Sequence, residues 1–173
     1  IRQRKGELGG LTVAIVCDLS LSRGARSTSR ALLTLGVGEL RLVSPASLMP
    51  DPGELEGATR HHTLAAGIRD ADVVMALRIQ HERMSASDPL DKEAFYREWG
   101  ISTDNLRHAK PDAIVMHPGP MNRGVEITSE VADGPQSVIR QQVTNGVAVR
   151  MAVLATIVRN VQERNVEAGR RAV

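Results

Sequence analysis

Four short apolar runs recur along the chain, and each is bounded by glycine, proline or polar residues. They cover Leu11–Cys17, Leu40–Ser44, Ala71–Leu77 and Ala113–Met116. Runs of this length between turn residues predict buried strands rather than helices. We expect the strands to be parallel, to lie in one sheet and to end near Asp18, Ser44, Leu77 and Met116.

Helical patterns alternate with these runs. The expected helices cover Arg23–Leu35, Ala65–Arg69, Ser87–Trp99, Ser102–Ala109 and Ser137–Arg164. The alternation predicts an α/β fold with a doubly wound, mainly parallel, Rossmann-like sheet and helices on both faces. No change of composition marks a boundary, so residues 1–173 are expected to form a single domain.

The last helical pattern carries a stripe of apolar residues spaced mostly three or four apart. Its members are Val138, Val143, Val147, Met151, Leu154 and Val158. Such a stripe predicts a helix that buries one side, and we expect it to pack on the sheet.

A proline-rich segment, His117–Ile127, directly follows the last apolar run. Pro118 and Pro120 lack backbone N–H groups, and Gly119 between them has no side chain. The backbone carbonyls at this strand end are therefore available to a ligand with N–H donors, such as an amide or an amine. A turn without any ligand is the simpler interpretation when the motif is considered by itself.

Candidate binding residues follow three of the predicted strands. Arg23 follows the first, Arg78 and Gln80 follow the third, and Gly119 and Pro120 follow the fourth. In a parallel sheet these positions share the carboxyl edge, where open α/β sheets bind ligands. Two arginines and a glutamine facing exposed carbonyls indicate a pocket for a small dicarboxylate that carries an amine. Solvated arginines, or an Arg78 that only caps the sheet edge, remain as alternatives.

The composition excludes several classes of function. Aromatic residues make up only 2% of the 173 residues, which argues against nucleic-acid binding by base stacking. The single cysteine, Cys17, permits no internal disulfide and is expected to pack in the core rather than act as a nucleophile. No membrane span, signal peptide, nucleotide-binding glycine motif or metal-ligand set is found, so we expect a cytoplasmic protein without cofactor or metal.

Five segments resemble one known family. They are Lys5–Val16, Ser22–Ser27, Leu77–Met84, Met116–Ile127 and Gln142–Met151. Together they are similar to the second, aspartate-binding domain of bacterial aspartate carbamoyltransferase, which joins carbamoyl phosphate to L-aspartate in pyrimidine biosynthesis. The resemblance covers nearly the whole chain and is closer to the aspartate enzymes than to the related ornithine enzymes.

The resemblance implies roles for individual residues. Arg23 and Arg78 are expected to hold the carboxylates of L-aspartate, assisted by Gln80. Gly119 and Pro120 are expected to contact the carbamoyl group of carbamoyl phosphate through their backbone carbonyls. The resemblance assigns no catalytic residue to this chain. Cys17 stands where the family usually has a glycine, so the turn after the first strand is expected to be crowded.

The family's first domain, which binds carbamoyl phosphate, has no counterpart in these residues. We expect that domain on the same or another chain, and the family implies a homotrimer of complete subunits. This chain alone is therefore expected to be inactive. The alternative is a non-catalytic domain that binds a dicarboxylate or a partner protein, as a pseudo-enzyme or a fused subunit.

Overall fold

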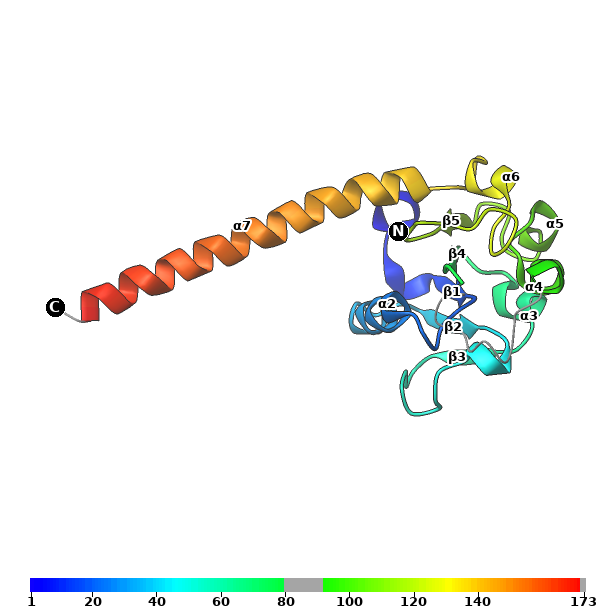
Figure 1. The fold of residues 1–173 in the computed structure, drawn as a ribbon, viewed down its shortest axis with the longest axis horizontal. Helices are drawn as coiled ribbons and strands as arrows, with labels where there is room; N and C mark the ends of the chain where they lie inside the picture. The colour runs from blue at the N-terminus through cyan, green and yellow to red at the C-terminus, as the bar shows by residue number, and fades with distance from the viewer. Residues whose placement is uncertain (80–91, 172–173) are drawn as a thin grey trace. The chain divides into compact units, whose positions relative to one another are not determined.

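The computed structural model describes residues 1–79 and 92–171, and side chains of that part except those of residues 92 and 165–171 (Figure 1). Gln80 and the first part of the helix expected from Ser87 lie outside the described residues. The chain divides into two compact units, Ile1–Ile139 and Arg140–Val173. The first unit contains the sheet and the candidate site.

Five parallel strands form one sheet in the order β3-β2-β1-β4-β5. Their bounds are β1 Thr12–Val16, β2 Glu39–Val43, β3 Thr59–His61, β4 Val73–Ala76 and β5 Ile114–Met116. The four predicted strands are therefore confirmed, and they lie in one sheet as expected. Sequence reasoning missed β3 because its residues Thr-Arg-His form no apolar run. This edge strand exists through its parallel pairing with β2, in which Leu42 lies opposite Arg60.

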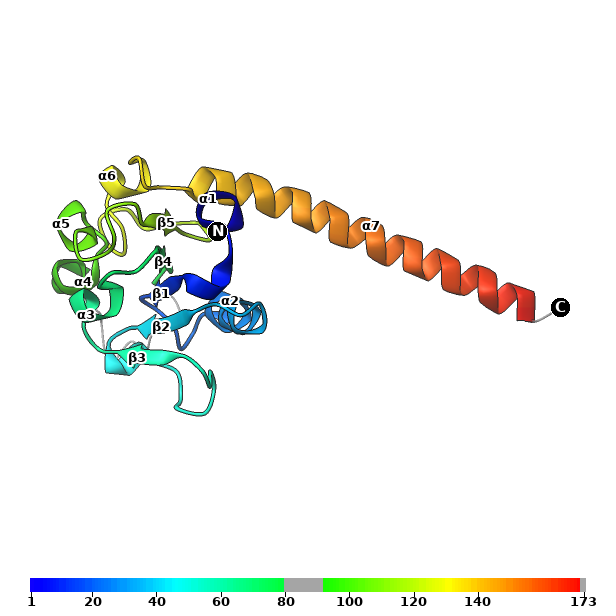
Figure 2. The ribbon, with the colours of Figure 1, turned by 180° about the vertical axis from the view of Figure 1, so that it is seen from behind.

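Helices cover both faces of the sheet, as predicted (Figures 1 and 2). Alternate strand residues point to opposite faces. Ala14 and Val16 of β1 accordingly belong to one buried cluster, whereas Val13 and Ile15 belong to another. The first cluster includes residues of α3, α4, α5 and α6, and the second includes residues of α2.

The helices of the first unit agree with most of the expected segments. They are α1 Arg2–Lys5, α2 Arg23–Thr34, α3 Leu64–Ile68, α4 Lys92–Trp99, α5 Thr103–Leu106 and α6 Ser129–Ala132, with 3-10 turns at Leu8–Gly10 and Ala46–Leu48. Ser102 caps α5, because its hydroxyl accepts the Asn105 N–H at 3.2 Å. The short helices α1 and α6 were not predicted. Their single turns are too short to show a helical period in the sequence.

The second unit is one helix, α7, whose bounds are Ile139–Arg171. From Val143 onward the helix exposes its large apolar side chains by 50% or more, and their expected packing on the sheet stays a prediction. They are Val143, Val147, Val149, Met151, Val153, Leu154, Ile157, Val158 and Val161.

Among the described residues, no helix is both long enough and apolar enough to span a membrane.

Candidate functional site

One cavity of about 270 Å³ lies where β1, β4 and β5 end. These three strands are neighbours in the sheet, so their carboxyl ends meet at one edge. The residues that line the cavity are Ser22, Arg23, Gly24, Leu77, Arg78, Pro118, Gly119 and Pro120. The structure therefore brings together Arg23, Arg78, Gly119 and Pro120, as the sequence predicted, and leaves Gln80 outside the described residues.

The turn after β1 positions Arg23. The Asp18 carboxylate is fully buried and accepts the Leu21 N–H at 3.0 Å, which closes the turn. The Ser22 hydroxyl then accepts the Ala25 N–H at 3.1 Å and caps α2. Arg23 is consequently the first residue of the helix, and its side chain is exposed at the cavity.

Cys17 takes a backbone conformation that normally belongs to glycine. Its φ is 89°, in the left-handed region that costs an L-residue about 1–2 kcal/mol. The backbone of this turn is therefore strained, and the expected crowding stays a prediction. The thiol is fully buried, and burial together with the negative charge of Glu126 raises its pKa. The expectation that Cys17 packs in the core is confirmed.

A second arginine braces the same turn. Arg26 Nε contacts Glu54 Oε2 at 2.6 Å, and its Nη2 donates to the Ser20 carbonyl at 3.0 Å. The hydrogen bond from Arg26 holds the pKa of Glu54 below its usual value. These contacts hold Arg26 against the turn. Arg23 is the arginine of α2 that lines the cavity.

Arg78 enters the cavity from β4. The Leu77 N–H donates to the Val16 carbonyl at 2.9 Å, which fixes the end of β4 beside the end of β1. Arg78, which comes next in the chain, is partly buried. Asn122 Nδ2 donates to the Ile79 carbonyl at 3.3 Å and so ties the segment after Arg78 to the proline-rich loop.

The proline-rich loop contributes backbone rather than side chains. Pro118, Gly119 and Pro120 are exposed, the Gly119–Pro120 peptide is cis, and Gly119 has a φ of 66° that glycine adopts readily. Beneath the loop lie His117 and Glu126, both fully buried. Sequence reasoning gave no role to these two residues or to Ser22, although a polar residue inside an apolar setting is a signal that could have marked His117.

The charge of the lining limits its chemistry. Two arginines line the cavity, and none of the described residues that line it carries a carboxylate. The only hydroxyl among them, on Ser22, is committed to the helix cap. Such a site can bind carboxylates through the guanidinium groups and N–H donors through the loop carbonyls. Within residues 1–79 and 92–171 no cluster of side chains is suited to a metal ion, and His61 and His62 do not form one.

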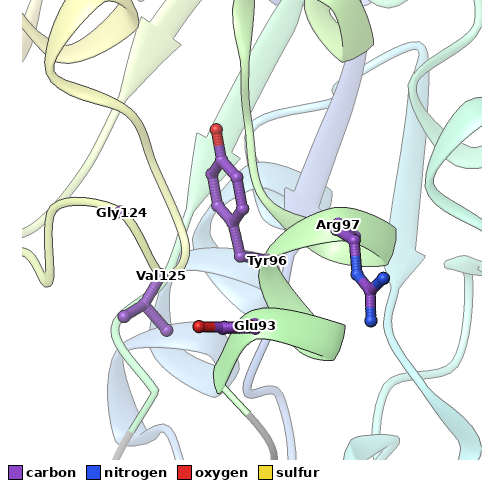
Figure 3. A pocket seen from close by; sticks show the side chains of 5 residues that line it. All are labelled: Glu93, Tyr96, Arg97, Gly124 and Val125. Carbon is purple, nitrogen blue, oxygen red and sulfur yellow. The ribbon is translucent and has the colours of Figure 1, made fainter.

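A second pocket, of about 370 Å³, lies between α4 and the Gly124–Val125 segment (Figure 3). Glu93 and Val125 face each other there, whereas the side chain of Arg97 points away from Val125. The polar groups of this pocket do not converge on one point. It is therefore a weaker candidate than the cavity at the sheet edge.

Known proteins resemble this chain in sequence and in fold. A family model described as the aspartate/ornithine carbamoyltransferase Asp/Orn binding domain matches residues 9–157. The ornithine carbamoyltransferase of Pyrococcus furiosus superposes with a TM-score of 0.77 at 29% identity, over 90% of this chain and 52% of that chain. The aspartate transcarbamoylase of Trypanosoma cruzi, solved with carbamoyl phosphate, gives 0.73 and 29%, over 89% and 52%.

A second ornithine carbamoyltransferase, from Gloeobacter violaceus, superposes with a TM-score of 0.74 at 26% identity, over 89% of this chain and 53% of that chain. The chain thus spans about half the length of these solved structures. Because the family model matches most of the sequence, the chain belongs to the aspartate/ornithine carbamoyltransferase family, as an Asp/Orn binding domain.

Proposed function

We propose that this chain is the aspartate-binding half of an aspartate carbamoyltransferase of the bacterial type, which acts in pyrimidine biosynthesis. The observation that carries the proposal is the charge of the cavity, which two arginines line. L-Aspartate carries two carboxylates, one for each guanidinium. Ornithine carries only one carboxylate, and its side-chain amine is the group that would be carbamoylated, so the second guanidinium would have no carboxylate to hold.

Arg23 and Arg78 hold the two carboxylates in this proposal, and Gln80 assists. Arg78 is the better placed for a bidentate contact, because it is partly buried and a planar guanidinium matches a carboxylate. Held in this way, the amine of aspartate is directed at the carbamoyl group. Orientation of this kind can supply a large part of a rate enhancement.

The carbonyls of Gly119 and Pro120 accept the N–H groups of the carbamoyl moiety of carbamoyl phosphate. The aspartate amine attacks the carbamoyl carbon, the new C–N bond forms, and the C–O bond to phosphate breaks with its electron pair leaving on phosphate. The attacking nitrogen then loses a proton. This reaction needs no covalent intermediate on the chain, whose part is to bind and orient.

The remaining half of the enzyme is proposed to be a carbamoyl-phosphate domain on the same or another chain, in a homotrimer of complete subunits. Two observations support a missing partner. The chain spans about half the length of the related structures, and α7 exposes a long row of apolar side chains. We expect residues 1–173 alone to form one substrate domain and not to turn over carbamoyl phosphate.

The test is made in the complete enzyme that contains this domain. Arg78→Ala removes charge-assisted hydrogen bonds worth roughly 1.5–3 kcal/mol each, so kcat/KM for aspartate should fall at least about tenfold. Arg78→Lys should not restore it, because an ammonium cannot reproduce the planar fork. Arg107→Ala is the control, since Arg107 is 77% exposed and makes one pair on the surface of α5.

Unchanged aspartate kinetics in both Arg78 variants would show that Arg78 only caps the sheet edge. The alternative function, a non-catalytic domain that binds a dicarboxylate or a partner protein, predicts aspartate binding without turnover even when the carbamoyl-phosphate domain is supplied.

A further inference from the structure

His117 and Glu126 form a pair that the proposed reaction does not use. Both side chains are fully buried, and His117 Nε2 lies 3.4 Å from Glu126 Oε1. His117 directly follows β5, and Glu126 lies on the far side of the proline-rich loop. The pair therefore joins the two ends of the loop that lines the cavity.

The hydrogen bonds of the pair fix the tautomer of the imidazole. The Gly119 N–H donates to His117 Nδ1 at 2.9 Å. A ring nitrogen that accepts a hydrogen bond carries no proton, so the proton of the neutral ring resides on Nε2. That proton faces the Glu126 carboxyl group. Glu126 Oε1 in turn accepts the backbone N–H of Asn122.

The two residues thus hold N–H groups on both sides of Pro120. Proline has no backbone N–H, so residues 118–122 contain only three such groups, those of Gly119, Met121 and Asn122. The pair binds two of them, those of Gly119 and Asn122. With these two donors held beneath the loop, carbonyl oxygens outnumber N–H groups among the backbone polar groups left for a ligand in the cavity.

The same network reaches the arginine side of the cavity. Asn122, whose backbone is held by Glu126, donates from Nδ2 to the carbonyl of Ile79, the residue after Arg78. One chain of contacts therefore connects the loop, the buried pair and the segment that carries Arg78. A shift of the pair would change the spacing between the loop carbonyls and the Arg78 guanidinium.

We propose that His117 and Glu126 are positioning residues that set this spacing. They act through backbone groups and do not touch the substrate. The effect on turnover rests on the proposed function, whereas the tautomer and the hold on the Gly119 N–H do not. Displacing reacting groups by about 1 Å can cost about 100-fold in rate, so a positioning defect should appear mainly in kcat.

The first experiment uses the 173-residue chain without substrate. Long-range 1H–15N correlation spectra report which ring nitrogen carries the proton, and His117→Asn identifies the signal. We expect an unprotonated Nδ1 and a protonated Nε2, with the Gly119 amide protected from exchange. A protonated Nδ1, or a Gly119 amide that exchanges as fast as an open loop, would overturn the proposal whatever reaction the protein performs.

The second experiment measures kinetics in the complete enzyme. His117→Asn places an amide oxygen near the position of Nδ1 and can still accept the Gly119 N–H, whereas His117→Gln reaches toward the position of Nε2. We expect His117→Asn to keep at least about tenfold more kcat than His117→Gln. Glu126→Gln, which keeps an acceptor for Asn122, should stay within about threefold of wild type, and Glu126→Ala should lose at least about tenfold.

Arg123→Ala serves as the matched control, because it breaks a nearby exposed pair with Asp133 without touching the held N–H groups. If Glu126→Ala does not fold, the two His117 variants and Glu126→Gln still decide the matter. Equal kcat in His117→Asn and His117→Gln at equal thermal stability would overturn the proposal, because it would show that the pair only packs in the core. Absence of any aspartate turnover, with the expected tautomer present, would refute the proposed function and leave the hold on the loop intact.

Discussion

At the scale of the residue, Cys17 shows how local strain can be found before a structure exists. The resemblance implies a glycine at this position, and the structure gives the cysteine a φ of 89°. Its side chain is completely buried, so strain and packing oppose each other at one position. The balance between them is open to a direct measurement of stability.

At Cys17 we expect glycine to destabilise the fold less than valine does, the opposite of what is usual at a buried strand end. Cys17→Gly removes about 1–2 kcal/mol of backbone strain and loses a small buried side chain, so its free energy of unfolding should stay within about 1 kcal/mol of wild type. Cys17→Val adds a β-branched side chain at positive φ and should cost more than about 2 kcal/mol. Urea unfolding decides this, and a valine variant more stable than the glycine variant would refute the strain.

At the scale of the element, the start of α2 connects stability with the cavity. The caps of α2 and α5 use the same chemistry, because Ser22 and Ser102 each accept an N–H three residues on. Only Ser22 lines the cavity, directly before Arg23. The two serines therefore make a matched pair in which helix capping and ligand binding can be separated.

Ser22→Ala and Ser102→Ala should each lower the free energy of unfolding by about 1 kcal/mol, the usual loss for an N-cap. In the complete enzyme, KM for aspartate should rise in Ser22→Ala alone, since its loss frees the turn that carries Arg23. Thermal melting and steady-state kinetics on both variants check this. An equal rise of KM in Ser102→Ala would mean that general destabilisation, and not the position of Arg23, is the cause.

A second element-scale contact joins the amino ends of the strands. Asp72, which is 6% exposed, accepts the Thr12 N–H at 3.0 Å and Lys110 Nζ at 2.8 Å. Burial raises the pKa of Asp72, but these two hydrogen bonds together with the positive charges of Lys110 and Lys5 outweigh it, so the pKa in the folded chain lies below its usual value. The carboxylate therefore stabilises the fold above the pKa of the unfolded chain, and this contribution is lost as pH falls through the lower folded value.

Asp72→Asn should consequently cost about 2 kcal/mol at pH 7, and the difference from wild type should narrow below about pH 4. Urea unfolding between about pH 7 and about pH 3 measures it. Asp112→Asn is the control, because Asp112 pairs with Lys5 but is 78% exposed, so its change should be much smaller. A difference for Asp72→Asn that stays constant over this whole range would contradict the direction of the pKa.

At the scale of the whole molecule, the sequence predicted the sheet and the meeting of Arg23, Arg78, Gly119 and Pro120 at one edge. This succeeded because apolar runs mark buried strands, and parallel strands bring the residues after their carboxyl ends to one side of the sheet. The edge strand β3 was not predicted, because it is stabilised by its pairing with β2 and its own residues form no apolar run. The roles of His117 and Glu126 were not predicted, because the sequence does not show that both side chains are buried and face each other.

The exposed stripe of α7 belongs to the same scale. Its spacing was recognised correctly, but spacing shows only that a helix needs an apolar partner and does not say which one. The related structures are about twice as long as this chain. We therefore propose that the surface which covers α7 is supplied by the remainder of the enzyme.

The two arginines of the cavity are proposed to select L-aspartate over L-ornithine. The most direct measurement supplies the complete enzyme with carbamoyl phosphate and equal concentrations of L-aspartate and L-ornithine, and identifies the product. We predict carbamoyl aspartate as the sole carbamoylated product, with a preference that weakens in Arg78→Ala and not in Arg107→Ala. Citrulline as the main product would contradict the proposal, because ornithine has one carboxylate and would leave one of the two guanidinium groups without the carboxylate that it is proposed to hold.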